Sequence, residues 1–135
     1  MRKKNSTLEF SSERSELLLK NFRESLARQS RISTMKAFQD AADAPAPRFW
    51  VSEARAMRII APMMNGDYSL LEGMQAEKRK MYEEIFRRVK ARKELHPEEP
   101  LGDIVFEVVN SPAPCSYMTA DRTKRLVNAL RHRRS

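Results

Sequence analysis

Glycine and cysteine are scarce in this chain, which has three glycines and one cysteine among its 135 residues. The lone cysteine, Cys115, excludes an intramolecular disulfide, and no cysteine–histidine cluster has the spacing of a zinc site. Gly66, Gly73 and Gly102 stand apart from one another, so the sequence has no glycine-rich loop of the kind that cradles phosphates in nucleotide-binding proteins. We therefore expect no metal and no cofactor.

Long apolar runs are missing too. No stretch approaches the roughly 20 apolar residues that a membrane-spanning helix needs. The opening segment MRKKNSTLEF is basic, but the apolar run of a signal peptide does not follow it. We expect a cytoplasmic protein that does not contact membranes.

Groupings of catalytic residues are equally sparse. His96 lies beside a proline in a predicted connection, His132 lies in a basic segment, and no histidine is near Cys115 in the sequence. Solvated histidines and a small buried thiol are the ordinary interpretation of such residues. We expect that the protein is not an enzyme.

Positive charge is what the chain has in excess. It has 26 lysines and arginines against 18 aspartates and glutamates, with a formal net charge of +8. This excess favours a polyanionic partner such as nucleic acid, although a basic surface that only keeps the protein soluble would give the same total. The hydrophobic content of 41% indicates a folded domain, and the few glycines and strand-like alternations favour helices.

One eight-residue phrase occurs twice. PAPRFWVS begins at Pro45 and PAPCSYMT at Pro112, which sets an offset of 67 residues. The same offset pairs Arg55 with Arg122 and places apolar residues with helical i, i+3, i+4 spacing before each phrase. Further upstream an offset of 64 pairs Phe22 with Phe86. We interpret the chain as an internal duplication.

The duplication predicts a mainly α fold in which two three-helix repeats pack about a pseudo-twofold axis. Residues 1–135 form a single domain, with a flexible basic start at 1–10 and a basic tail at 132–135. Repeat one covers residues 11–66, a connector covers 67–76, and repeat two covers 77–131. In repeat one we expect helices from Ser11 or Ser12 to about Ser30, from Ser33 to before Pro45, and from Ser52 to about Asn65. In repeat two we expect helices over AEKRKMYEEIFRRVKARKEL and LGDIVFEVVN, and a third from Thr119 to Arg131.

The repeated phrase itself is interpreted as a joint between helices. Its prolines end one helix, and its serine or threonine starts the next. Trp50 and Tyr117 occupy the same position in the two phrases, so we expect both in the core. The alternative for Trp50 is stacking on a nucleic-acid base. A minimal two-stranded ribbon near these two residues would join the repeats. Arg48 and Phe49 differ from their counterparts, Cys115 and Ser116, and are therefore candidates for a specialised contact.

Two resemblances accompany this pattern. The segments FWVSEARA, KMYEEIFRRV and VVNSPAPCSYMT make the chain similar to a group of short uncharacterised bacterial proteins with two Pro-Ala-x-x-x-aromatic-x-Ser/Thr repeats, over about Leu17 to Leu130. That resemblance implies a shared fold and no activity. The segment FQDAADAPAPRFWVSEARAMRII weakly resembles a helix-turn-helix DNA-binding domain, with two prolines and an extended piece in place of the tight turn. This second resemblance implies DNA binding.

The sequence therefore predicts a non-enzymatic protein that binds nucleic acid mainly through contacts with the nucleic-acid backbone. DNA is favoured over RNA as the expected ligand. Arg55 and Arg122 fall near the start of the third helix of each repeat, where side chains can reach phosphates or base edges. The candidate nucleic-acid-binding residues are Arg48, Arg55, Arg58, Arg122, Lys124, Arg125, Arg131, Arg133 and Arg134. The alternative is a protein-interaction or self-assembly module that uses Phe49, Met63, Met64 and the Pro-Ala-Pro loops.

Overall fold

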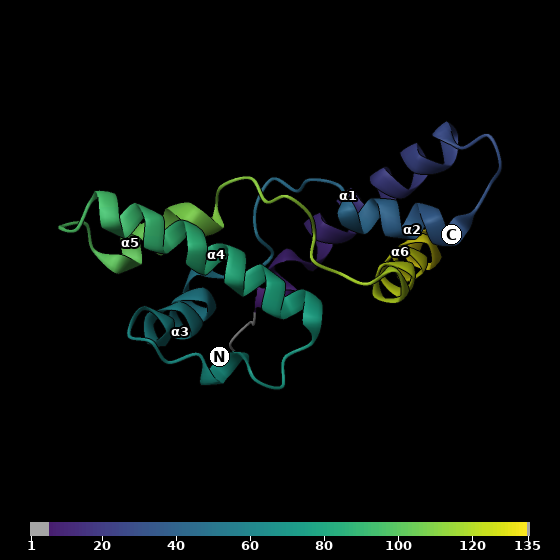
Figure 1. The fold of residues 1–135 in the computed structure, drawn as a ribbon. Helices are drawn as coiled ribbons and strands as arrows, with labels where there is room; N and C mark the ends of the chain where they lie inside the picture. Colours follow the sequence, from purple (N-terminus) through teal and green to yellow (C-terminus); the bar gives the residue numbers. More distant parts are fainter. Residues whose placement is uncertain (1–5, 135) are drawn as a thin grey trace.

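A computed structural model describes residues 6–134, and these residues form six α-helices and one short 3-10 turn (Figure 1). The helices are α1 (Ser6–Arg28), α2 (Thr34–Asp43), α3 (Glu53–Met64), α4 (Ala76–Leu95), α5 (Leu101–Val109) and α6 (Ala120–Arg134), with the turn η1 (Ser69–Leu71) before α4. The predicted mainly helical class is confirmed. Within the described part of the chain, no helix combines the length and the apolarity that crossing a membrane requires.

Three helices begin at the predicted hydroxyl residues. Ser33 accepts a hydrogen bond from the backbone N–H of Lys36 at 3.3 Å, and Ser52 accepts one from Arg55 at 3.1 Å. Thr119 accepts one from the backbone N–H of Arg122 at 3.1 Å. Each side chain thus satisfies one of the N–H groups that the first turn of a helix leaves unpaired, so these predicted N-caps are confirmed.

The first and last helices are longer than predicted. α1 begins at Ser6, so the part of the predicted flexible start that the structure describes is helical, while residues 1–5 lie outside the described residues. Phe10 explains the extension, because its ring lies 6.3 Å from that of Trp50 and 4.0 Å from the guanidinium of Arg48. α6 continues to Arg134, so the predicted basic tail is helical up to that residue, and cations are favourable at a helix C-terminus.

The helices pack in two groups of three. The first group contains α1, α2 and α6, and the second contains α3, α4 and α5; Figure 1 shows them at opposite ends of the molecule. Buried residues of the first group include Leu18, Phe22, Phe38, Val127 and Leu130, with the Phe22 and Phe38 rings stacked 4.3 Å apart. The buried residues of the second group include Ile60, Tyr82, Ile85, Val89, Ile104 and Val109.

The two packing groups do not follow the predicted repeats. α3 belongs to repeat one in sequence, yet it packs against α4 and α5 of repeat two. α6 belongs to repeat two, yet it packs against α1 and α2 of repeat one. Each half of the chain therefore lends its third helix to the other half, and α2 and α3 lie in different groups although they are neighbours in the sequence.

The two Pro-Ala-Pro phrases are where the chain crosses between the groups. Ala46 and Ala113 exchange backbone hydrogen bonds of 3.0 and 2.9 Å and form an isolated antiparallel bridge. On either side of the bridge, Phe49 N–H donates to Val109 at 3.0 Å and Ser116 N–H donates to Ala42 at 2.9 Å. The described residues contain this bridge and no strand, so the ribbon predicted near Trp50 and Tyr117 is not observed there.

Candidate anion-binding pocket

A pocket of about 940 Å³ lies between the two groups of helices. Its lining comes from α1, α3, α4 and α6, together with residues of both crossing segments. The exchange of third helices positions this pocket, because it brings the first turns of α3 and α6 beside residues of α1 and α4.

Positive charge dominates the lining of the pocket. Five cationic side chains contribute to it, namely Arg14, Arg55, Lys78, Arg122 and Arg125. Two acidic side chains, Glu72 and Glu77, also line it, which leaves a net charge of +3 among the described residues of the lining. Glu77 is already engaged in an ion pair with Lys80 at 3.5 Å. The pocket is therefore suited to an anion.

Arg14 is the most unusual of these cations. It is 5% exposed, because it lies one helical turn before the fully buried Leu18 on the same face of α1. Its Nε is buried without a hydrogen-bond partner, and none of the described carboxylates forms an ion pair with it. Burial and the neighbouring charge of Arg122 lower the pKa of Arg14 to about 10. A buried nitrogen of a charged group without a partner is costly, and an anion bound to Arg14 in the pocket would offset that cost.

A second polar group without a partner lies in the same lining. Tyr82 of α4 is fully buried, and its hydroxyl has no hydrogen-bond partner in the described structure. Burial raises the pKa of Tyr82, and the charges of Arg55 and Arg58 act in the opposite direction. The hydroxyl therefore remains protonated at neutral pH and can donate a hydrogen bond to a ligand.

Three helices begin at the pocket. The first turns of α3, α4 and α6 contribute lining residues, among them Arg55, Lys78 and Arg122. Ser52 and Thr119 cap α3 and α6, whereas no side chain caps α4 after Gln75. The N-terminus of a helix carries a partial positive charge and unpaired N–H groups, both of which attract anions.

Aromatic residues from the crossing segments complete the lining. Trp50 is 8% exposed and donates a hydrogen bond from Nε1 to Ser116 Oγ at 3.1 Å, so its predicted place in the core is confirmed. Tyr117 is half-buried, and its ring stacks on the buried ring of Phe49 at 6.1 Å. Trp50 and Tyr117, which are equivalent at the offset of 67, thus line the same pocket.

Arg48 and Phe49, the pair that differs between the two phrases, both make contacts at the crossing. Arg48 donates hydrogen bonds to the carbonyl oxygens of Phe49 and Val51 and to Asn110 Oδ1, at 2.9, 2.8 and 2.8 Å. Phe49 is 1% exposed and belongs to the core. The prediction of a partner contact for Phe49 is wrong, because this side chain is buried between the crossing segments. Met63, named for the assembly alternative, is buried as well.

The predicted nucleic-acid-binding residues divide between the pocket and the surface. Arg55, Arg122 and Arg125 line the pocket. Arg58, Lys124 and Arg133 are exposed outside it, and Arg131 is exposed above the Phe22 ring at 5.9 Å. The side chain of Arg134 lies outside the described residues. These residues stay predictions.

Arg14, Lys78 and Tyr82 were missed by the sequence analysis. A charged residue on a helix is usually solvated, so the positions of Arg14 and Lys78 carried no evident signal. The repeat offset of 64 residues does give a signal for these positions, because it pairs Arg14 with Lys78 and Leu18 with Tyr82. Extended to these positions, the repeat predicts one cation in each half, located one helical turn before a buried residue on the same helix face.

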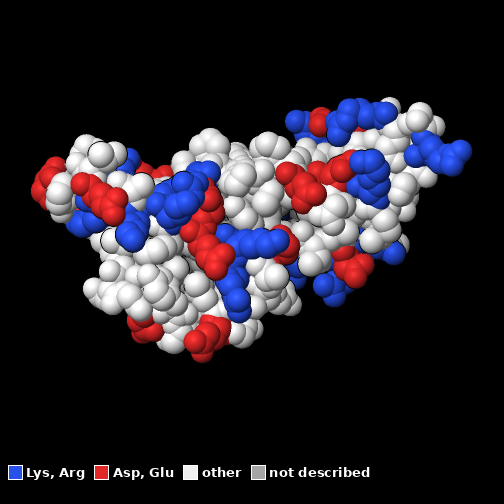
Figure 2. All heavy atoms as spheres, viewed as in Figure 1, with Lys and Arg blue, Asp and Glu red and all other residues white. Residues whose placement is uncertain are grey.

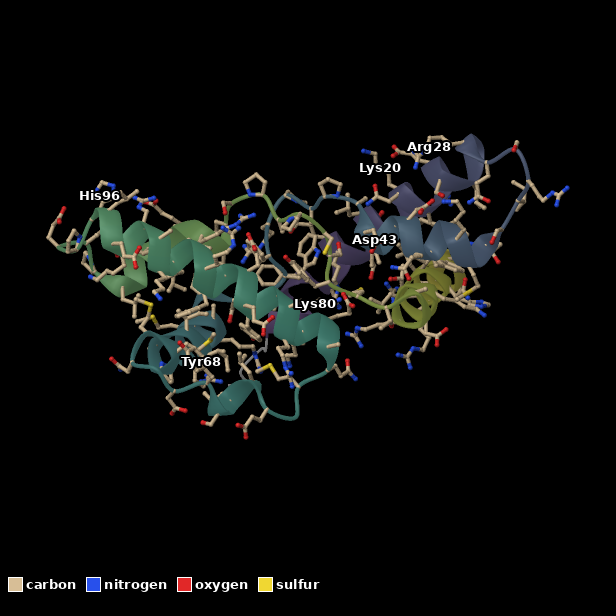
Figure 3. The ribbon with its side chains drawn as sticks, viewed as in Figure 1. Lys20, Arg28, Asp43, Tyr68, Lys80 and His96 are labelled. Carbon is tan, nitrogen blue, oxygen red and sulfur yellow. The ribbon has the colours of Figure 1, made fainter. Side chains whose placement is uncertain are left out.

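The surface outside the pocket is mixed in charge. On the face in Figure 2, basic and acidic side chains alternate and do not merge into one basic stripe. Lys20 and Arg28 lie along α1 in the first group, and Lys80 lies at the middle of the molecule (Figure 3). The cationic lining of the pocket is thus a local feature rather than part of a uniformly basic face.

Groups that could support other chemistry are dispersed. His96 lies at the outer end of the second group (Figure 3), whereas His132 belongs to α6 in the first. The described residues contain no cluster of three or more histidine, cysteine, aspartate or glutamate side chains that could hold a metal ion. Burial raises the pKa of the half-buried Cys115.

Comparison with family models, curated proteins and solved structures found no match to this chain.

Proposed function

We propose that this protein binds nucleic acid, with the pocket between the two helical groups as the principal contact for its phosphates. The observation that carries the proposal is the buried, unpaired Arg14 within a lining of net charge +3. An anionic ligand would provide the charge that none of the described carboxylates supplies. Phosphates are the anions that nucleic acid presents at every nucleotide, and arginine is well suited to bind them.

The two third helices support the proposal by their matching arginines. Arg55 and Arg58 on α3 correspond to Arg122 and Arg125 on α6 at the offset of 67. In each pair the two residues are three apart near the start of the helix, and therefore project from one side of it. A nucleic-acid strand that runs along the pocket would meet one pair of arginines from each helix.

We also infer that the chain is a duplication with a local twofold axis through the pocket. The packing of α1 with α2 and α6 corresponds to the packing of α4 with α5 and α3. The hydrogen bonds Phe49 to Val109 and Ser116 to Ala42 exchange with each other at the offset of 67. A twofold site suits a ligand with a repeating backbone, because both halves offer similar donors.

Binding is tested by fluorescence anisotropy with labelled single- and double-stranded DNA over a salt series. We expect the affinity to fall steeply with salt, because phosphate contacts release counterions. Arg122→Gln combined with Arg125→Gln should reduce the slope of log affinity against log salt by about 1–2 and weaken binding roughly tenfold.

Arg23→Gln combined with Arg31→Gln is the matched control, because it removes the same charge from exposed positions away from the pocket. Affinity that does not vary with salt would contradict the proposal. Equal loss of affinity in both double variants would assign binding to net charge and remove the pocket from it.

A further inference from the structure

The unpaired cation at the pocket demands a ligand that can reach it. Arg14 is 5% exposed, so an anion contacts it only by entering the pocket. An internal phosphate of a strand is esterified on two sides and continues into the chain in both directions. A terminal phosphate is esterified once, has three oxygens free to accept hydrogen bonds, and carries a charge of about −1.5 to −2 at neutral pH.

The donors in the lining match such a group. Nε of Arg14 and the hydroxyl of Tyr82 are both buried without a hydrogen-bond partner in the described structure, and the first turn of α4 has no side-chain cap. Arg122 adds a second cation, and its charge contributes to lowering the pKa of Arg14. These donors come from α1, α4 and α6, and so approach the pocket from different elements rather than from one surface.

The pocket also has room for more than the phosphate. Its volume of about 940 Å³ lies at the upper end of the roughly 300–1,000 Å³ typical of small-molecule sites. Trp50, Tyr117 and Met118 line it beside the cations and offer apolar surface to a sugar or base. The space and the mixed lining therefore fit a terminal nucleotide.

We infer that the pocket receives the terminal phosphate of a nucleic-acid strand, with Arg14 and Tyr82 as its inner contacts and Arg55 and Arg122 nearer the solvent. This inference rests on the proposed function, since it names the part of the nucleic acid that the pocket takes. The exposed arginines of α3 and α6 then contact the phosphates that come next along the strand.

The test compares three forms of one labelled oligonucleotide: unphosphorylated, phosphorylated at its 5′ end, and phosphorylated at its 3′ end. The full-length protein should bind one of the phosphorylated forms about tenfold more tightly than the unphosphorylated form, because hydrogen bonds to a charged group in a buried site are strong. Arg14→Gln should abolish this preference, so that the variant binds the three forms with equal affinity. Arg23→Gln, an exposed change on the same helix, should preserve the preference.

Two further measurements test the inference even if Arg14→Gln perturbs the fold. Tyr82→Phe removes only the hydroxyl, and should reduce the preference for the phosphorylated form while leaving the circular dichroism spectrum unchanged. Inorganic phosphate should raise the unfolding temperature of the natural protein more than chloride does at equal ionic strength, and this difference should be lost in Arg14→Gln.

Equal affinity for all three oligonucleotides would overturn the inference and leave the proposed function standing. Stabilisation by inorganic phosphate together with equal affinities would assign the pocket to free phosphate, and would also overturn it. Failure to bind any of the three oligonucleotides would overturn both the inference and the proposed function.

Discussion

The guanidinium group of Arg48 stabilises the region where the two Pro-Ala-Pro segments cross between the helical groups. It donates to two backbone carbonyls next to the crossing and to Asn110 at the end of α5, and it lies over the ring of Phe10. The equivalent position in the second phrase is Cys115, which has none of these donors. The divergence between the phrases thus contributes to packing at the crossing.

Tyr117 has a backbone conformation that is unusual for a residue with a side chain. Its φ is 55°, in the left-handed region that few residues other than glycine adopt. Stacking on Phe49 holds the ring in place, and burial raises the pKa of the hydroxyl to about 12, with Cys115 and Glu84 contributing further. The folded state therefore favours the neutral phenol.

This preference predicts a loss of stability at alkaline pH. The pKa of Tyr117 in the folded protein lies above the ordinary value of about 10, so its contribution is fully present below pH 10 and is lost as the pH rises toward about 12. Tyr117→Phe should flatten that decline in urea unfolding measured over this range. It should also remove the tyrosinate absorbance change centred near pH 12.

Tyr68→Phe is the control for this titration, because Tyr68 is 49% exposed and lies away from the crossing. It should leave the decline in stability between pH 10 and pH 12 unchanged. A Tyr117→Phe protein that loses stability as steeply as the natural chain would refute the assignment.

Two helices begin in the same way and border the same pocket. Ser52 caps α3 and Thr119 caps α6, each by accepting a hydrogen bond from the residue three positions later, Arg55 and Arg122 respectively. Ser52→Ala and Thr119→Ala should each lower the free energy of unfolding by about 1 kcal/mol. Chemical denaturation monitored by circular dichroism measures both changes.

Ser12→Ala provides the matched control, since Ser12 is exposed within α1. Alanine is the better helix former there, so the stability should stay the same or rise slightly. If the two cap variants were as stable as Ser12→Ala, the hydroxyl groups would not be what starts these helices.

The elements were largely predictable because their signals are local. Ser33, Ser52 and Thr119 mark helix starts, and Pro45 marks the end of α2, regardless of what packs against those helices. α1 starts earlier than the sequence predicts, because its first turns depend on a contact between Phe10 and Trp50. That contact joins residues far apart in the chain and leaves no periodic pattern near Phe10.

At the scale of the whole molecule, the partner of each third helix could not be predicted. The apolar face of α3, with Ile60 and Met63, would suit any complementary pair of helices, and periodicity shows only that such a face exists. The crossing at Ala46 and Ala113 decides the pairing, and its hydrogen bonds are made by backbone atoms. For the same reason the pocket was only partly predicted: Arg55, Arg122 and Arg125 carry a local signal, whereas Arg14 acquires its role by packing.

The exchange of third helices predicts that neither half of the chain folds alone. A fragment of residues 1–66 contains α3 without α4 and α5, and a fragment of residues 67–135 contains α6 without α1 and α2. Each fragment should show weak helical circular dichroism and no cooperative thermal transition. An equimolar mixture should recover both, because each fragment provides the partners for the third helix of the other.

Cleavage of the intact protein between Gly66 and Asp67 is the control for this experiment, since it yields the same two pieces after folding. The cleaved protein should remain associated in size-exclusion chromatography. A 1–66 fragment that unfolds cooperatively by itself would show that α3 does not depend on the second half.

Protein synthesis gives the exchange a temporal consequence. The chain emerges N-terminus first, so α1 and α2 are made before the other four described helices, yet they pack against α6, the 15-residue helix that is made after the other five. The second group is complete once α5 has left the ribosome, whereas the first group must wait until α6 has also been made. A ribosome that stops before Ala120 would release a chain with one closed core and one open core, and with no Arg122 beside Arg14.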